Sequence, residues 1–149
     1  MIETENIITD ALSQALETMA YLAVLPIEDD QAAPDQCLLA EMTFTGPKCG
    51  TIQILAGTDF CGTLAENIGA LDTVDDEARS DSLKELSNVT CGLVLPLVGS
   101  SDEDVFDVTV PALTDSADCP TWDEFTADAN CCVSNIEGDL VAVKLIVKE

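Results

Sequence analysis

The sequence predicts an α+β fold in which an antiparallel or mixed sheet carries long helices on one face. Three observations lead to this class. Apolar residues recur at helical spacing over two long segments, short runs rich in β-branched residues follow each segment, and helices and strands are grouped rather than alternating. Because each half places a helix before its strands, we also expect two similar helix-plus-strands halves.

Length and composition predict a single domain over residues 1–149. The chain is 47% hydrophobic with a mean hydropathy of +0.23, so it can bury a core and is not a disordered acidic tail. It has 5 Lys and Arg residues against 29 Asp and Glu residues, which gives a net charge of −24. Such a surface repels phosphates, so we expect neither nucleic acids nor anionic membranes as partners.

The first half begins with a predicted helix. Apolar residues recur every three or four positions from Asn6 onward, and Pro26 ends this pattern. Residues 28–35 are acidic or small for the most part and predict an exposed linker.

A hairpin and a second helix complete the first half. The apolar and β-branched runs at 38–45 and 51–56 flank the turn residues 46–50, which predicts two paired strands. Residues 57–59 offer an N-cap for a helix that ends near Gly69.

The second half has the longer predicted helix. It starts at the acidic residues 75–77, which suit a helix N-terminus, and ends near Pro96 or Gly99. The acidic residues 100–104 predict a loop, and residues 106–110 predict a strand.

The C-terminal part ends in two predicted strands. An irregular stretch around Trp122 comes first, and the strands then cover residues 131–136 and 140–147. Residues 137–139 include a glycine, which favours a tight turn between them.

The sequence has no histidine and seven cysteines. The absence of histidine excludes Ser-His-Asp and Cys-His catalysis, histidine phosphotransfer and imidazole metal sites. The cysteines form no C-x-x-C pair, and the chain has neither a signal-peptide pattern nor an apolar run long enough for a membrane helix. We therefore expect buried, reduced thiols in a cytoplasmic protein. Zinc held by Cys119, Cys131 and Cys132 is the alternative, but the spacing is unsuitable and no fourth ligand stands out.

Three polar residues of the long helix lie on one stripe. Asp81, Glu85 and Asn88 stand at positions i, i+4 and i+7, which share one side of a helix. The apolar residues that point to the opposite side, where a sheet covers them, are Leu83, Leu86, Val89, Leu93 and Leu97. The pattern predicts an acid and an amide on an exposed ridge, which by itself is typical of a solvated helix face.

The spacing Asp81-x3-Glu85-x2-Asn88, followed after 22 residues by Pro111, resembles the signature of a bacterial chemotaxis phosphatase family. This family contains CheC, CheX and FliY, and all four signature positions match. The chain length, the N-terminal helix, the apolar hairpin and the long helix before the C-terminal strands also resemble the CheX type. The resemblance therefore covers essentially the whole chain.

This resemblance implies a protein phosphatase that hydrolyses the aspartyl phosphate of a CheY-type response regulator. It implies that Glu85 docks on an active-site Lys of the regulator and that Asn88 orients the attacking water. Asp81 and Pro111 would shape the helix and the surface beside it. Mg²⁺ is expected on the regulator, with no metal or cofactor bound by this chain.

The implied mechanism agrees with the residue types present. An aspartyl phosphate is already activated, so a phosphatase mainly has to place water in line. A neutral amide both donates and accepts hydrogen bonds to water, and no histidine base is needed. A Cys-based phosphatase needs an Arg shortly after its Cys, whereas the one arginine, Arg79, is far from Cys61, the nearest preceding cysteine.

CheC-type members carry a second copy of the motif in the first half. Here the first helix offers Asp10, Gln14 and Glu17 at the motif spacing, and the alternative frame from Ser13 reaches Ala20 instead of an Asn. The second copy is therefore absent, which favours the CheX type.

The resemblance also implies a homodimer formed by extending the sheet across an edge. Residues 140–147, which are nearly all apolar, form either that edge strand or an ordinary central strand. The alternative function is a non-catalytic adaptor of the same fold that binds a response regulator or a receptor.

Overall fold

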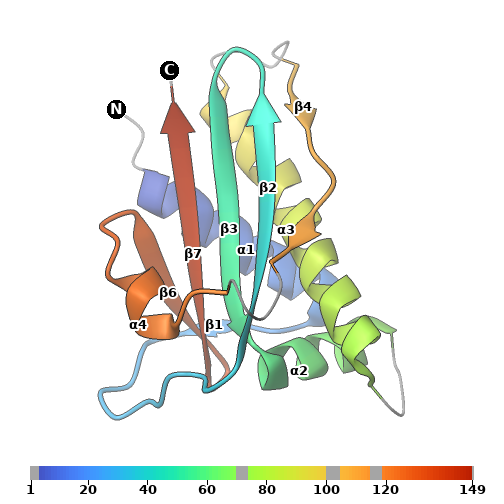
Figure 1. The fold of residues 1–149 in the computed structure, drawn as a ribbon, viewed down its shortest axis with the longest axis vertical. Coiled ribbons are helices and arrows are strands. Elements are labelled where there is room, and N and C mark those ends of the chain that lie inside the picture. Colours follow the sequence, from blue (N-terminus) through green and yellow to red (C-terminus); the bar gives the residue numbers. More distant parts are fainter. Residues whose placement is uncertain (1–3, 70–73, 100–104, 115–118, 149) are drawn as a thin grey trace.

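A computed structural model describes residues 4–69, 74–99, 105–114 and 119–148. Within these ranges seven strands form one antiparallel sheet in the order β1-β6-β7-β3-β2-β4, and β5 also pairs with β2 (Figure 1). The strands are β1 (Val24–Leu25), β2 (Cys37–Thr45), β3 (Cys49–Gly57), β4 (Asp107–Val108), β5 (Ala112–Leu113), β6 (Cys131–Ile136) and β7 (Asp139–Lys148).

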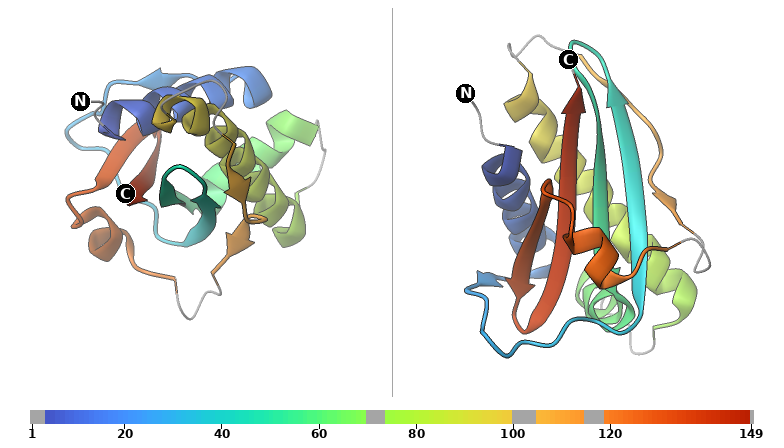
Figure 2. Two further views of the ribbon diagram at one scale, coloured as in Figure 1. Left: turned by 90° about the horizontal axis from the view of Figure 1, so that it is seen from above. Right: turned by 60° about the vertical axis from the view of Figure 1, so that its left-hand side comes forward.

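Long helices cover one face of this sheet, as the sequence predicts. The helices are α1 (Thr4–Ala20), α2 (Thr58–Gly69), α3 (Asp76–Val98) and α4 (Trp122–Thr126). The first three pack on the same face, and the short α4 lies on the opposite one (Figure 2). The predicted α+β class, with an antiparallel sheet, is confirmed.

The two predicted halves are visible in the sheet order. The strand order β1-β6-β7-β3-β2-β4 is symmetric about its centre. In this symmetry β1 corresponds to β4, β6 to β2, and β7 to β3. The central pair β3–β7 therefore relates two similar arrangements, in which α1 and α3 are the corresponding long helices.

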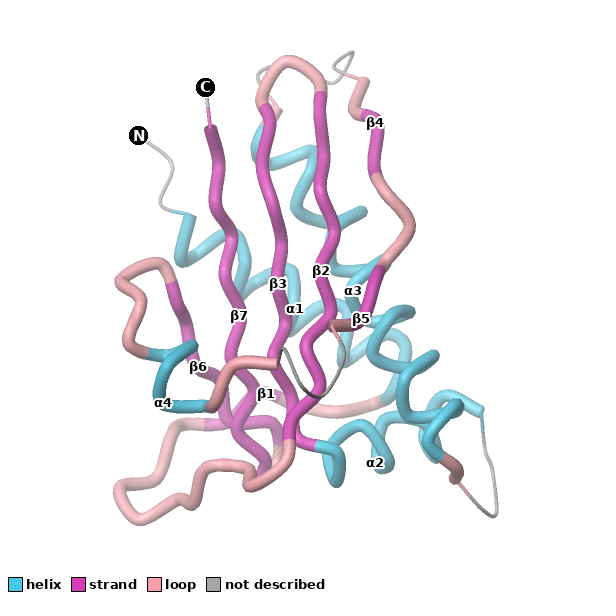
Figure 3. The backbone as a smooth tube through the Cα atoms, viewed as in Figure 1, coloured by secondary structure: helices cyan, strands magenta, loops and turns pink. Residues whose placement is uncertain are grey.

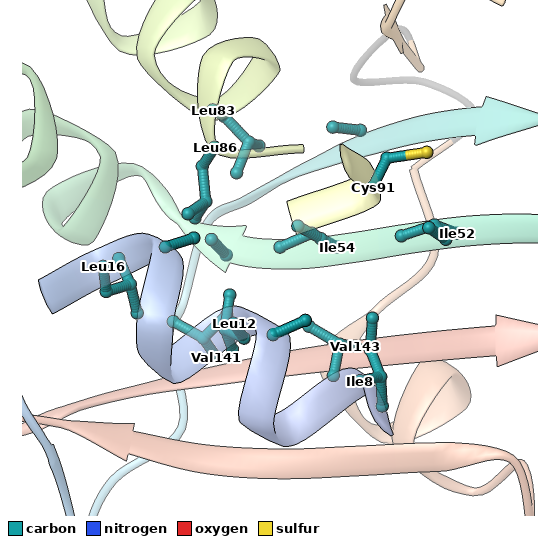
Figure 4. Close-up of a cluster of buried hydrophobic side chains, with 14 of the residues drawn as sticks. Ile8, Leu12, Leu16, Ile52, Ile54, Leu83, Leu86, Cys91, Val141 and Val143 are labelled. Atoms are coloured by element: carbon teal, nitrogen blue, oxygen red, sulfur yellow. The ribbon is translucent and has the colours of Figure 1, made fainter. Parts of the chain in front are cut away.

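The main core lies between the sheet and helices α1, α2 and α3. Figure 4 shows side chains of the two long helices facing side chains of β3 and β7. The helices contribute Ile8, Leu12 and Leu16 from α1 and Leu83 and Leu86 from α3, and the strands contribute Ile52, Ile54, Val141 and Val143. Complete burial of a large apolar side chain stabilises the fold by about 1.5–3 kcal/mol relative to exposure. The buried face of α3 therefore fixes which of its residues face solvent.

Most of the predicted elements agree with the structure. The hairpin, the second helix, the long helix and the two C-terminal strands all form within one to three residues of the expected positions. Asp75 is the N-cap of α3. Residues 28–35 are mostly exposed, as expected for a linker. The expected acidic loop at 100–104 lies outside the described residues.

The first helix ends earlier than predicted. It stops at Ala20 rather than near Pro26, because Tyr21 adopts a positive φ of 57°, a left-handed conformation that cannot continue a right-handed helix. The Leu22 amide then donates a hydrogen bond to the Leu16 carbonyl at 3.2 Å. Leu22 is still buried, which explains why the apolar pattern continues past the end of the helix.

Two short elements also differ from the prediction. The strand expected at 106–110 is reduced to β4, and β5 follows it on the same side of β2. The stretch expected to be irregular around Trp122 contains α4. Its signal in the sequence is a capping box, in which Thr121 and Glu124 satisfy each other's backbone amides.

β7 is a central strand and not an edge strand. It pairs with β3 on one side and with β6 on the other. The interpretation of residues 140–147 as a dimerisation edge is therefore wrong, because both backbone edges of this strand are already occupied. The central-strand alternative is correct, and it agrees with the unbroken burial from Leu140 to Leu145.

Candidate active site

The long helix α3 presents its polar residues on an exposed ridge. Asp81, Glu85 and Asn88 are all exposed, as the helical spacing predicts. The N-terminus of the helix is fixed by Asp75, whose carboxylate accepts a hydrogen bond from the Ala78 amide at 2.8 Å. A cap of this kind contributes about 1 kcal/mol to helix stability, so the ridge starts from a well-defined first turn.

The opposite side of α3 packs on the sheet. Leu83 and Leu86 are completely buried, as predicted, and Val89 and Leu93 are partly buried. Leu97 was expected on this side but is 46% exposed. Leu97 lies in the last turn of α3, next to the helix end at Val98, where Val98 is buried instead.

A second segment faces the ridge across a surface groove. This segment, residues 108–111, runs from the end of β4 to the start of β5 along the outer side of β2 (Figure 3). The groove has a volume of about 540 Å³ and is lined by Asp81, Lys84, Glu85, Asn88, Val108, Thr109, Val110 and Pro111. The four residues of the predicted motif therefore line one groove, although Pro111 lies outside the helix that carries the other three.

Hydrogen bonds to β2 fix the far side of the groove. The Thr109 amide donates to the Thr43 carbonyl at 2.9 Å, and the Thr109 hydroxyl accepts from the Thr43 amide at 2.9 Å. Val108 and Val110 remain 47% and 83% exposed. The groove thus has a polar, charged side on α3 and a mainly apolar side on the β4–β5 segment. Of this second side, sequence reasoning identified Pro111 and missed Val108 and Val110.

The polar side chains of the groove are available to a ligand. Within the described residues, none of Asp81, Lys84, Glu85 and Asn88 makes a side-chain hydrogen bond or an ion pair. Two acids, one cation and one neutral amide therefore face solvent together. The sequence analysis did not single out Lys84 as a residue of the groove. The feature that indicates it is its i+3 spacing from Asp81, which places the two side chains on neighbouring turns of the same helix.

The cysteines do not supply a nucleophile to this groove. All seven are free, and none lines it. Burial raises the pKa of Cys61 to about 12, with a smaller contribution from the Cys37 thiol, and burial raises the pKa of Cys37 to about 11. A thiol with such a pKa is protonated at neutral pH and is a poor nucleophile.

The structure also locates the residues of the alternative zinc site. The Cys119 thiol donates to the Cys37 carbonyl at 3.6 Å, and the Cys131 thiol contacts the Cys132 carbonyl at 3.9 Å. Among the residues that the structure describes, no three His, Cys, Asp or Glu side chains lie together as a metal site requires.

The first-half stripe lies on α1. Asp10, Gln14 and Glu17 are exposed on this helix, and Ala20, the end of the alternative frame, is completely buried. α1 therefore presents acids and an amide at the same spacing as α3, in a different order.

Comparisons with known proteins agree on the fold. The chain is similar to CheX of Desulfovibrio desulfuricans, with 17% identity and a TM-score of 0.72 over 99% of this chain and 100% of that one. CheX of Vibrio vulnificus gives 16% identity and a TM-score of 0.71 over 99% and 97% of the two chains. A chain of the CheX–CheY–BeF3–Mg²⁺ complex of Borrelia burgdorferi gives 16% identity and a TM-score of 0.68 over the full length of both.

At these identities the comparisons establish the fold, which is that of the CheX and CheC-like chemotaxis proteins. No family model and no curated protein sequence matches the chain. In the described part of the chain, no helix is long and apolar enough to span a membrane.

Proposed function

We propose that this protein is a phosphatase that hydrolyses the aspartyl phosphate of a CheY-type response regulator in the cytoplasm. One observation carries the proposal: Asp81, Glu85, Asn88 and Pro111, which match the family signature in sequence, line a single open groove. The fold comparison supports it, since one chain of the same fold comes from a complex with CheY, BeF3 and Mg²⁺.

The two central residues have different roles in the proposed reaction. Glu85 is exposed and without an ion pair among the described residues, so it is available to bind a lysine at the regulator's phosphorylation site. Asn88 lies one turn further along the same ridge. Its amide holds a water molecule by accepting one hydrogen bond and donating another, in line with the bond from phosphorus to the aspartyl oxygen.

The regulator supplies the remaining chemistry. Water adds to phosphorus as the acyl phosphate bond breaks, which releases inorganic phosphate and returns the aspartate as a carboxylate. Mg²⁺ bound by the regulator neutralises charge on the phosphoryl oxygens. Asp81 and Pro111 shape the two sides of the groove.

The experiment measures phosphate loss from a phosphorylated CheY-type regulator with Mg²⁺, with and without this protein. We expect Asn88→Ala to lower the turnover rate about 100-fold, because positioned water is lost. Glu85→Ala should lower both turnover and affinity, because docking is lost as well. Gln14→Ala and Glu17→Ala on α1 are matched controls that remove an exposed amide and an exposed acid elsewhere.

An adaptor gives a different result. If the wild-type protein binds the regulator but phosphate is lost at the rate of the regulator alone, the catalytic proposal is wrong and the non-catalytic alternative holds.

We retain the expected homodimer as part of the proposal, formed through a surface other than β7. Light scattering coupled to size exclusion tests it.

A further inference from the structure

The groove contains one cation, in a chain with very few. The five Lys and Arg residues are Lys48, Arg79, Lys84, Lys144 and Lys148. Arg79 pairs with Asp76 at 3.1 Å, and the nearly buried Lys144 pairs with Asp128 at 3.2 Å while lying 4.0 Å from the centre of the Phe125 ring.

The position of Lys84 sets it apart from the other cations. Of the five, it alone lines the groove among the described residues, and it is half-buried there. It makes no ion pair within the described chain, although Asp81 and Glu85 are its neighbours on the ridge. In a protein of net charge −24, this half-buried lysine therefore carries a positive charge that the described part of the fold does not pair.

The helical geometry places Lys84 and Glu85 on opposite sides of Asn88. With roughly 100° between consecutive residues, Asn88 projects at an angle between these two side chains. The water-positioning amide of the proposed reaction is therefore flanked by one positive and one negative group. A partner that meets this surface in a single orientation must present an anion on one side and a cation on the other.

We propose that Lys84 is a docking residue that binds an anionic oxygen at the regulator's phosphorylation site, an inference that rests on the proposed function. This oxygen lies opposite the regulator's lysine that binds Glu85. The oxygen belongs either to the phosphoryl group or to a carboxylate beside it. Phosphorylation sites built on aspartate are strongly acidic, and this chain is acidic too. Lys84 offsets that repulsion locally and fixes the orientation of the partner by charge complementarity.

The test uses titrations with the CheY-type regulators of the source organism, each with Mg²⁺, with and without beryllofluoride. Lys84→Met keeps the aliphatic stem and removes the charge, and Lys84→Arg restores it. Lys48→Met is the matched control, because Lys48 is also half-buried but lies in the β2–β3 turn, outside the groove.

We expect Lys84→Met to raise Kd about tenfold at low salt. The difference should shrink as salt screens the charge. Lys84→Arg should recover most of the affinity, and Lys48→Met should bind like wild type. A loss seen only with beryllofluoride identifies the phosphoryl oxygen, and a loss in both states identifies a carboxylate.

Wild-type affinity in Lys84→Met, or a loss that neither salt nor Lys84→Arg changes, overturns the inference while the proposed function stands. If no regulator binds the wild-type protein in either state, the proposed function itself fails, and the inference fails with it.

Discussion

Thr43 and Thr109 are joined by two hydrogen bonds of 2.9 Å at the edge of the sheet, one in each direction. Thr109 lines the groove, and α3 packs against β2, the strand that carries Thr43. The two sides of the groove are therefore held by the same strand. This explains how α3 and the two-residue strand β4, which belong to different layers of the fold, are held in place on the two sides of the groove.

Thr109→Val should widen or loosen the groove. The substitution removes the hydroxyl that accepts from the Thr43 amide, which costs about 1 kcal/mol and lowers Tm by about 2–4 °C. We expect KM for the phosphorylated regulator to rise about threefold with little change in kcat, because the regulator docks against the β4–β5 side of the groove as well as against α3. Thr126→Val on α4 is the control: it also loses one hydrogen bond, that to the Trp122 carbonyl, and should lower Tm without changing KM.

The short helix α4 should matter for stability and not for turnover. Phe125 is 3% exposed and packs on the outer face of the sheet with Leu39, Leu55 and Ala142. Phe125→Ala should therefore lower the free energy of unfolding by about 3–5 kcal/mol, as measured by urea denaturation. Because the groove lies elsewhere, kcat and KM well below Tm should match wild type. A change in kcat larger than the change in folded fraction would contradict this separation.

The buried thiols should make the protein less stable at alkaline pH. Burial raises the pKa of the Cys61 thiol to about 12 and that of the Cys131 thiol to about 11, from the ordinary value of 9.0. The unfolded chain therefore releases these protons from about pH 9 upward while the folded protein retains them. Stability is fully present below pH 9 and is lost as pH rises toward the folded-state values. Thermal melts from pH 7 to pH 11 should show falling Tm, and Cys61→Ala should give a shallower slope.

The long elements could be predicted from the sequence because their signals are local. α3 has an acidic N-cap region and a repeating apolar side, and the β2–β3 hairpin has two β-branched runs around a glycine turn. The exposed ridge of Asp81, Glu85 and Asn88 follows from helical geometry alone.

The rest depends on contacts between distant segments. β4 and β5 are two residues long and exist because β2 offers an edge to them, so their bounds are not encoded in their own residues. The same pairing places Pro111 in the groove that Asn88 lines. Tyr21 ends α1 by a backbone conformation that the apolar pattern does not reveal. The role proposed for Lys84 depends on its making no ion pair among the described residues, which only the folded arrangement can show.

The most direct test of the account is the turnover rate of Asn88→Asp at saturating phosphorylated regulator. This variant keeps the side-chain shape but removes the amide donor and adds negative charge beside the phosphoryl group. Gln14→Glu makes the same chemical change on the exposed ridge of α1 and serves as the control. We predict a loss of at least about 100-fold for Asn88→Asp and wild-type turnover for Gln14→Glu. Equal turnover in the two variants and the wild-type protein would contradict the assignment of this groove as the site of hydrolysis.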